Sequence, residues 1–366
     1  MLEQMLDEFR SRILERKPLR IRGGGSKDFY GGPLAGEVLD TGGYGGIVSY
    51  EPTELVITAR CGTPLAELES ALAARRQFLA CEPPGFGRAT VGGEISGGAT
   101  IGGAVAAGLS GPRRASAGSL RDFVLGVKIM DGEGRVLKFG GEVIKNVAGF
   151  DVSRLMTGGL GTLGLILEVS LKVMPLPVGD ATLRFDLPQD KALDAMNRWA
   201  GQPLPLVAST WQEGVLTVRM SGAQAAVAAA CRKLGGEPLA ATAAAGFWHG
   251  LREQSAEFFA GPDTHAPLWR LSVPSVAPPL ELPAEPLIEW GGAQRWLRAD
   301  ADATLMRDTA ARAGGHSTLF RGGHGEQRAG GVFAPLPPAL MEVHRRLKHS
   351  FDPYGVFNPG RLYPEF

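Results

Sequence analysis

The sequence is poor in cysteine, and its cysteines lack the spacing of a metal site. Cys61, Cys81 and Cys231 are the three cysteines among 366 residues, and no CxxC pair occurs. A zinc site or an iron–sulfur cluster built from cysteines needs several thiolates close together, and a disulfide framework needs an even set. We therefore expect no metal site and a protein of a reducing compartment.

An excess of charge of one sign and long apolar runs are also missing. The 38 basic residues balance the 38 acidic residues, which argues against a nucleic-acid-binding protein. No apolar run approaches the roughly 18 residues that a membrane-spanning helix needs. Acidic residues near the N-terminus also disagree with a signal peptide. Together these absences predict a cytoplasmic protein.

Glycine, in contrast, is abundant at 52 residues, and its densest run spans 87–122. Because glycine has no Cβ, its backbone can approach a flat or charged ligand closely, and successive N–H groups can form a nest for a phosphate. A flexible linker is the alternative interpretation. Against it, apolar residues recur through the run as buried anchors would: Val91, Ile95, Ile101, Val105 and Leu109. The run therefore indicates a ligand-binding loop system.

This run contains a tandem repeat. ATVGGEISGG (89–98) is followed directly by ATIGGAVAAG (99–108). Two short copies are too few for a solenoid, so a local duplication is the simpler interpretation. The second copy leads directly into LSGPRR, which favours this copy for ligand contact.

Two further glycine turns accompany the run. A strand predicted over 18–22 opens into GGGSK (23–27), which offers three glycine N–H groups, a serine hydroxyl and a lysine charge. A tight turn with a solvated lysine is the alternative. The second turn, GGLGTLG (158–164), matches G-x-G-x-x-G, but a Rossmann site needs a following helix, and residues 165–173 alternate as a strand. We therefore reject a Rossmann site there, and no P-loop motif occurs in the chain.

The remaining pattern predicts short, mixed elements. Before residue 175 these are helices over 2–16 and 64–75, strands over 39–40, 47–50 and 55–59, a hairpin of 123–131 with 135–139, and a loop or short helix over 142–155. Thr63 is the expected N-cap of the second helix, with Pro64 at its first position. Residues 175–177 mark a domain boundary.

The second half changes character and contains few glycine loops. It predicts strands over 181–185, 215–220, 294–298 and 316–320 and helices over 191–200, 223–234, 303–313 and 338–349. The alanine-rich stretch 241–245 receives no assignment, and the proline-rich stretch 274–286 is expected to be a surface connection or the edge of a lid. This half is therefore expected to be α+β, with antiparallel strands and helices on one side.

The chain resembles the vanillyl-alcohol-oxidase-type, or PCMH-type, FAD-binding family. The resemblance lies in the order of the glycine turns and of the segments KNVAGFDVSRL, GTLGLILEVSLKV and FNPGR. The resemblance implies an α+β fold. A PCMH-type FAD-binding domain of two subdomains would span 1–177. An FAD-linked oxidase-type C-terminal domain, an antiparallel sheet plus helices, would span 178–366, with the tail 351–366 returning to the flavin.

A closer resemblance covers nearly the whole chain. The chain is similar to the FAD-binding E subunits of bacterial glycolate oxidases in the segments VSYEPTELVITARCGTPL, CEPP, SLRDFVLG, IEWGGAQRWL and DPYGVFNPGRLY. ATVGGEISGG departs from the pattern of these subunits as an insertion. The resemblance implies a flavin-dependent oxidoreductase acting on CH–OH donors in a multi-subunit complex. Such a complex oxidises the 2-hydroxy acid glycolate to glyoxylate. Its partners are a larger FAD subunit and an iron–sulfur subunit that passes electrons to the quinone pool, which would bring a cytoplasmic chain to the inner membrane.

The resemblance also implies which residues hold the FAD. The pyrophosphate would lie at Gly23, Gly24, Gly25, Ser26 and Lys27. The flavin and ribityl chain would lie along Thr100, Ile101, Gly102, Gly103, Gly108, Ser110 and Gly111, near Arg121 and Asp122. The adenosine would lie at Gly161, Gly164 and Ile166, and Asn358 belongs to the returning tail. Some relatives attach FAD through a histidine in the first turn. Ser26 stands there in this chain, which predicts non-covalent FAD.

A catalytic residue is harder to assign. Oxidation of a 2-hydroxy acid needs a base for the hydroxyl proton and a cation for the carboxylate. His316 and His324 are the candidate bases, and Arg321, Arg270 and Arg361 are candidate carboxylate partners. HGEQ, which begins at His324, differs from the HGxGDGN motif of the larger oxidising relatives, so FAD binding is better supported than independent oxidation.

Alternatives therefore remain open. Arg113 and Arg114 fit a phosphate contact and a solvated or partner-facing pair equally well. A self-sufficient, D-lactate-like 2-hydroxy-acid dehydrogenase and a non-catalytic scaffold are the two rival functions. The UDP-sugar reductase branch of the fold would need NADPH and a catalytic serine or glutamate arrangement that we do not find.

Overall fold

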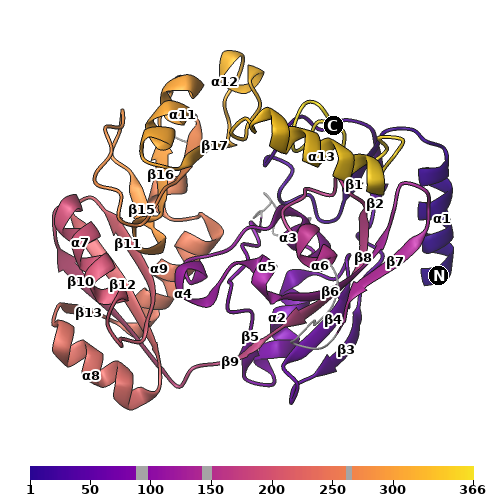
Figure 1. The fold of residues 1–366 in the computed structure, drawn as a ribbon. Helices are drawn as coiled ribbons and strands as arrows, with labels where there is room; N and C mark the ends of the chain where they lie inside the picture. The colour runs from indigo at the N-terminus through magenta and orange to yellow at the C-terminus, as the bar shows by residue number, and fades with distance from the viewer. Residues whose placement is uncertain (88–97, 142–150, 261–265) are drawn as a thin grey trace. The chain divides into compact units, whose positions relative to one another are not determined.

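A computed structural model describes residues 1–87, 98–141, 151–260 and 266–366. The chain divides into two compact units (Figure 1). The first unit comprises Met1–Leu109, Ser119–Pro175 and Pro335–Phe366, and the second comprises Ser110–Gly118 and Leu176–Ala334. Two predictions fall on residues outside these ranges. They are the first repeat copy up to residue 97, which includes Val91 and Ile95, and residues 142–150 of the predicted loop or short helix.

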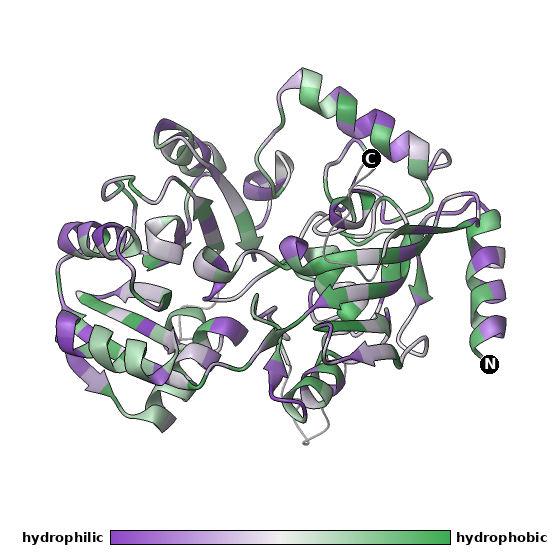
Figure 2. Ribbon diagram, turned by 60° about the horizontal axis from the view of Figure 1, so that its bottom comes forward, coloured by the Kyte–Doolittle hydropathy of each residue, from purple (hydrophilic) through white to green (hydrophobic). Residues whose placement is uncertain are grey.

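An antiparallel sheet forms the centre of the first unit. Its order is β3 (Ile47–Glu51), β4 (Val56–Arg60), β8 (Leu165–Lys172), β6 (Val124–Met130) and β7 (Val136–Gly140). Figure 2 shows hydrophobic residues along these strands. The predicted hairpin is confirmed, because Met130 pairs with Val136 across the turn. A strand, β8, follows the third glycine turn, so the rejection of a Rossmann site is confirmed as well.

Amphipathic helices cover this sheet and its edges. They are α1 (Leu2–Leu14), α2 (Leu65–Ala73), α3 (Ile101–Ala107), α5 (Leu120–Phe123) and α6 (Val152–Leu155). The predicted helical pattern holds in α1, which buries Phe9 and Ile13. The predicted Thr63 cap is wrong: Pro64 is the N-cap residue, and the Thr63 hydroxyl instead accepts from the Gly46 N–H at 2.9 Å and donates to the Arg60 carbonyl oxygen at 2.7 Å.

Two short sheets and a terminal helix complete the first unit. β1 (Leu19–Arg22) runs parallel to β2 (Glu37–Asp40), and β5 (Gln77–Phe78) pairs with β9 (Met174–Pro175). The helix α13 (Pro338–Phe351) leads into the tail, where Phe357 forms a parallel bridge with Leu19. The C-terminal residues thus add to the strand that precedes the first glycine turn.

The second unit is built on an eight-stranded antiparallel sheet. Its order is β13 (Glu237–Leu239), β10 (Gly179–Asp186), β12 (Val215–Gly222), β11 (Leu206–Gln212), β15 (Leu287–Glu289), β16 (Gln294–Arg298), β14 (Leu268–Ser272) and β17 (His316–Arg321). The predicted α+β class with an antiparallel sheet in the second half is therefore confirmed.

Helices pack against this sheet in two hydrophobic clusters. α7 (Gln189–Ala200) and α8 (Gln224–Leu234) share one cluster with β10, β11 and β12, and α11 (Ala303–Arg312) shares the other with β14, β16 and β17. The alanine-rich stretch left unassigned is the start of α9 (Ala241–Glu253), which buries Trp248 and Leu251. The smaller helices are α4 (Arg114–Ala117), α10 (Glu257–Ala260), η1 (Trp290–Gly292) and α12 (Glu326–Ala329).

The units are not continuous in sequence. The second unit begins again at Leu176, close to the expected boundary, but it also takes Ser110–Gly118 from the middle of the first half. The first unit takes back the whole of Pro335–Phe366, including α13. Within the described ranges, none of the helices has the length and apolar character that crossing a membrane requires.

Candidate cofactor site

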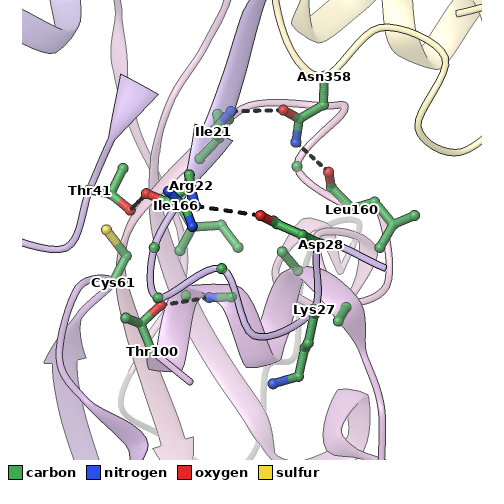
Figure 3. Close-up of a pocket in the computed structure, with 18 of the residues that line it drawn as sticks. Ile21, Arg22, Lys27, Asp28, Thr41, Cys61, Thr100, Leu160, Ile166 and Asn358 are labelled. Atoms are coloured by element: carbon green, nitrogen blue, oxygen red, sulfur yellow. Dashed lines mark hydrogen bonds and ion pairs between the residues drawn. The ribbon is translucent and has the colours of Figure 1, made fainter. Parts of the chain in front are cut away.

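A cavity in the first unit lies where the described glycine turns come together (Figure 3). The empty space between its walls, part of it open to solvent, is about 810 Å³. Residues from β1 and the first turn, from α3, from the third turn and from the tail line it. Segments more than 300 residues apart in sequence thus form one site.

The first glycine turn presents unpaired backbone donors to this cavity. The N–H groups of Gly23, Gly24, Gly25 and Ser26 donate to no described residue. The turn is closed by the Asp28 N–H, which donates to the Gly25 carbonyl oxygen at 3.1 Å, and Gly25 adopts a φ of 71°. Successive free N–H groups at a left-handed glycine form a nest that suits an anion.

The charge around this turn is mainly positive. Among the described lining residues, Arg20, Arg22, Lys27 and Arg361 are basic, whereas Asp28 is the single acid. The Asp28 carboxylate pairs with Arg20 and, at 3.4 Å, with the Arg22 Nε. One carboxylate cannot neutralise four cations, so the cavity favours an anionic ligand.

The helix α3 contributes surface rather than donors. Its first N–H groups are used within the protein: those of Ile101 and Gly102 donate to the Thr63 and Cys61 carbonyl oxygens, both at 2.9 Å, and that of Gly103 donates to the Thr100 hydroxyl at 3.3 Å. The expectation of an N–H nest in this part of the run is therefore wrong. Its physical reason is that the glycines start a helix capped by Thr100.

The glycines of the site differ in what a side chain would meet. A Cβ on Gly23 would lie 2.3 Å from the Thr100 Oγ1, and one on Gly102 would lie 2.5 Å from the Cys61 Cβ. Those two glycines allow segments of the protein to approach each other. A Cβ on Gly103 would meet, within the described residues, the Thr100 Oγ1 at 3.3 Å and nothing else within 4 Å, so this glycine borders the cavity itself.

Asn358 of the tail joins the first and third turns (Figure 3). Its Oδ1 accepts a hydrogen bond of 2.8 Å from the Ile21 N–H, and its Nδ2 donates at 2.6 Å to the Leu160 carbonyl oxygen. Asn358 is buried, and Gly161 beside it leaves the space that its amide occupies. The returning tail therefore holds two walls of the cavity together.

Cys61, which the sequence did not single out, forms part of the wall beside Thr41. Burial raises the pKa of the Cys61 thiol from 9.0 to about 12, and a hydrogen bond with Thr41 opposes this increase only in part. The thiol thus stays protonated and unreactive at neutral pH. No spacing in the sequence distinguishes this cysteine from Cys81 or Cys231.

The cavity brings together most of the residues predicted to hold the cofactor. Those that line it are Gly23, Gly24, Gly25, Ser26, Lys27, Thr100, Gly102, Gly103, Gly161, Gly164, Ile166 and Asn358. Those that do not are Ile101, Gly108, Ser110, Gly111, Arg121 and Asp122. Lining residues that sequence reasoning missed include Arg20, Asp28, Thr41 and Leu160, which carry no motif of their own.

The residues outside the lining have structural partners. Gly108 ends α3 with a φ of 64°, and the Gly111 carbonyl oxygen accepts from the Trp290 Nε1 within the second unit. Asp122 accepts from the Ser119 N–H at 2.8 Å in a capping box. Arg121, which is exposed, lies 3.4 Å from the Thr157 carbonyl oxygen.

None of the candidate catalytic residues of the second unit lines the cavity. His316 begins β17, and partial desolvation, followed by the Arg270 charge, lowers its pKa. The His324 N–H donates to the Gln327 side chain. Arg321 donates to the Gln254 side chain at 2.8 Å, and burial lowers its pKa to about 10.

Three further arginines considered from the sequence also have partners. The lining residue Arg361 donates to backbone carbonyl oxygens of the loop that follows the first turn, among them that of Gly32. Arg113 is buried and lies 3.3 Å from Asp180, and the Arg114 guanidinium lies 4.5 Å from the centre of the Trp290 ring. Across the residues that the structure describes, no group of three or more His, Cys, Asp or Glu side chains is placed to hold a metal ion.

Comparisons with known proteins agree with this geometry. The FAD binding domain family matches residues 13–100 and 98–140. The glycolate oxidase subunit GlcE of Escherichia coli (strain K12) is 46% identical over 364 residues, covering 99% of this chain and 97% of that protein. The glycolate oxidase subunit GlcD of Bacillus subtilis (strain 168) is 29% identical over 137 residues, covering 37% of this chain and 27% of that protein.

Two further likenesses are more distant. A D-lactate dehydrogenase of Anaerostipes hadrus is 35% identical over 132 residues, which cover 36% of this chain and 25% of the dehydrogenase. A solved structure of alkyldihydroxyacetonephosphate synthase matches with a TM-score of 0.65 at 14% identity, covering 98% of this chain and 76% of the synthase. This second likeness supports the fold alone. The 46% identity to GlcE over 99% of this chain, together with the match to the FAD binding domain family, shows that the chain belongs to the family of the glycolate oxidase subunit GlcE, among the PCMH-type FAD-binding proteins.

Proposed function

We propose that this chain is the non-covalent FAD-binding subunit of a glycolate oxidase complex. In that complex glycolate is oxidised to glyoxylate, and electrons pass through an iron–sulfur subunit to the quinone pool. Membership of the GlcE family supports the assignment. The observation that carries it is the row of N–H groups from Gly23 to Ser26, which have no partner in the described part of the chain and line a cavity with an excess of arginine and lysine.

The cavity residues fit FAD. The N–H groups of the first turn and the charges of Arg22 and Lys27 would hold the pyrophosphate, because they combine a nest with cations. The small residues of α3, such as Gly103 and Ala106, would admit a flat ring system. When bound, FAD supplies the two-electron acceptor that oxidation of a CH–OH donor requires.

Non-covalent binding has two supports in the first unit. No histidine is found among the described residues that line the cavity. The one lining thiol, Cys61, stays protonated because burial raises its pKa to about 12. The described lining residues therefore offer neither a histidine nor a reactive thiol to attach a flavin.

Substrate oxidation is assigned to the larger FAD subunit rather than to this chain. A base must lie within hydrogen-bond reach of the hydroxyl whose proton it takes. His316, His324 and Arg321 belong to the second unit and are not among the residues that line the cavity, and the Arg321 guanidinium donates to the Gln254 side chain. We propose that the chain acts in the cytoplasm, peripheral to the inner membrane through its partners.

The test is to purify the full chain and record its visible absorption spectrum. A yellow protein that releases FAD on heating, with no flavin left on the denatured polypeptide, is the expected result. Binding of riboflavin, which lacks the pyrophosphate, should be much weaker than binding of FAD, because it cannot use the nest at Gly23–Ser26. A colourless protein that takes up no FAD after refolding in its excess would contradict the proposal.

One rival function has a specific observation in its favour. The likeness to two D-lactate dehydrogenases extends over 36% and 49% of this chain, which makes a self-sufficient 2-hydroxy-acid dehydrogenase the second candidate. The described cavity lining contains no histidine, and its single acid, Asp28, is paired with arginines, which argues against this candidate. Turnover of D-lactate or glycolate by the chain alone would decide in its favour.

A further inference from the structure

Lys348 is a buried cation that lies outside the cavity lining. Its side chain is 7% exposed, and its Nζ donates to the Thr162 carbonyl oxygen at 2.7 Å, the Asp352 Oδ2 at 2.7 Å and the Phe357 carbonyl oxygen at 2.9 Å. Three acceptors satisfy the three donors of an ammonium group. Such a buried charge is tolerated only when it is paired and fully hydrogen-bonded, so the geometry around it is strongly specified.

The three partners of Lys348 come from different parts of the first unit. Thr162 lies in the third glycine turn, between two glycines that line the cavity. Asp352 lies four residues after Lys348, in the tail. Its carboxylate accepts hydrogen bonds from the Val356 N–H at 2.9 Å and from the Phe357 N–H at 2.8 Å. The ion pair therefore shapes the tail and attaches it to the third turn.

From Phe357 the connection continues to the first turn. The Asn358 N–H donates to the Leu19 carbonyl oxygen at 2.9 Å, and its side chain bonds the Ile21 N–H at 2.8 Å and the Leu160 carbonyl oxygen at 2.6 Å. Ile21 lies two residues before Gly23, where the row of unpaired N–H groups begins. Hydrogen bonds joined by short stretches of chain thus link Lys348 to Ile21, two residues before the nest.

We propose that Lys348 is a positioning residue for FAD: it locks the tail to the third glycine turn and thereby holds the first turn in its anion-binding arrangement. This inference rests on the proposed FAD binding. A nest held ready before the ligand arrives loses less entropy on binding, so it binds more tightly. By thermodynamic linkage, bound FAD must stabilise the docked tail to the same extent.

The first experiment compares Lys348→Met with a control of matched type. Methionine keeps an unbranched side chain that is one atom shorter than that of lysine, and it removes all three donors. The control is Ser170→Ala, which removes a buried hydrogen bond of 2.8 Å to Thr58 in the same unit, and neither of these residues lines the cavity. The FAD Kd of each full-length chain is measured by flavin fluorescence, well below the thermal midpoint of the apoprotein.

We expect Lys348→Met to raise the FAD Kd by about tenfold or more, equivalent to about 1.4 kcal/mol. Ser170→Ala should lower the thermal midpoint and leave the Kd unchanged, because a purely structural role does not alter affinity. An unchanged Kd in folded Lys348→Met overturns the inference while FAD binding by the wild type stands. A wild-type chain that binds no FAD overturns the proposed function and the inference together.

A second measurement needs no variant and decides the question if Lys348→Met does not fold. Hydrogen exchange of the wild-type chain is followed by mass spectrometry with and without FAD. FAD should slow exchange in the peptide that contains the Val356, Phe357 and Asn358 amides, which are bonded in the docked tail. Equal exchange rates in the two states would show that the tail and the cofactor site are not coupled.

Discussion

At the scale of single residues, the glycines of the cavity act in different ways. Gly102 allows α3 to approach Cys61, since a Cβ there would lie 2.5 Å from the Cys61 Cβ. Gly103, one residue further along, faces open space apart from the Thr100 hydroxyl. Two glycines that look alike in the sequence are therefore required for two reasons, one for packing and the other for cofactor access.

This difference makes Gly103→Val the more specific test of the site. Its side chain would project toward the space assigned to the cofactor, so we expect FAD binding to be lost while the chain stays folded. Gly102→Val should instead lower the thermal stability sharply, because the new atoms overlap Cys61. FAD titration and thermal unfolding measure the two effects. Full flavin occupancy in Gly103→Val would show that the cofactor lies elsewhere.

Cys61 gives a prediction on pH. Burial raises its pKa from 9.0 to about 12 in the folded chain, so the folded state keeps the proton where the unfolded state loses it. This contribution to stability is complete below pH 9.0 and is lost as the pH rises toward about 12. In denaturant titrations from pH 8 to pH 10, Cys61→Ala should therefore lose less stability than the wild type does.

The same residue can be examined by alkylation. Iodoacetamide applied to the native protein near neutral pH should modify Cys231, which is half-buried, and spare the buried Cys61 and Cys81. Mass spectrometry of the digested protein identifies the labelled cysteines. Rapid labelling of Cys61 in the native state would contradict the burial that we describe.

At the scale of elements, the segment between α3 and α5 takes an unexpected course. Residues 110–118 leave the first unit and pack against β11 and η1 of the second. Arg113 is the buried anchor, with its Nη2 3.3 Å from both the Asp180 carboxylate and the Ser221 hydroxyl. The structure thus gives this arginine protein partners and leaves it outside the cavity, where the sequence had allowed a phosphate contact as well.

We accordingly expect Arg113→Met to destabilise the protein without weakening FAD binding. Hydrogen bonds to charged groups contribute about 1.5–3 kcal/mol when buried, so the loss should be visible in urea unfolding. Arg114→Met is the control. It removes an exposed cation–π contact with Trp290, which is worth about 0.5–1 kcal/mol. A rise of tenfold or so in the FAD Kd of Arg113→Met would favour the phosphate contact instead.

At the scale of the whole molecule, the cofactor site and the candidate catalytic residues belong to different units. The described lining of the cavity comes from the first unit, whereas His316, His324 and Arg321 come from the second. The described lining of the proposed cofactor site contains no histidine, and its single acid, Asp28, is paired with Arg20 and Arg22, which agrees with the proposal that substrate is oxidised on a partner subunit.

We therefore expect the isolated chain, loaded with FAD, to give little or no turnover of glycolate with a dye acceptor. Activity should appear when the chain is combined with the larger FAD subunit and the iron–sulfur subunit. Flavin counting on the purified complex should find one FAD for each copy of this chain in addition to the FAD of the larger subunit. Rapid turnover by the isolated chain would favour the self-sufficient dehydrogenase.

Local patterns in the sequence determined many of the elements. The spacing of Phe9 and Ile13 predicted α1, the alternation after Gly164 predicted β8, and the DGEG turn predicted the β6–β7 hairpin. Each of these depends on neighbours within a few residues, because helical and strand periods are local properties. The stretch at Ala241 escaped assignment, because its helix is defined by burial of the later Trp248 and Leu251 against the sheet.

The glycine turns themselves were also evident from the sequence, since glycine without a Cβ marks places of close approach. Only the tertiary structure decided which of their N–H groups are free. Those from Gly23 to Ser26 have no partner among the described residues, whereas those of Ile101 and Gly102 donate to the carbonyl groups of Thr63 and Cys61. Likewise only the fold brings Asn358 and Lys348 to turns that lie roughly two hundred or more residues earlier, because hydrogen bonds between remote segments form only once the chain is packed.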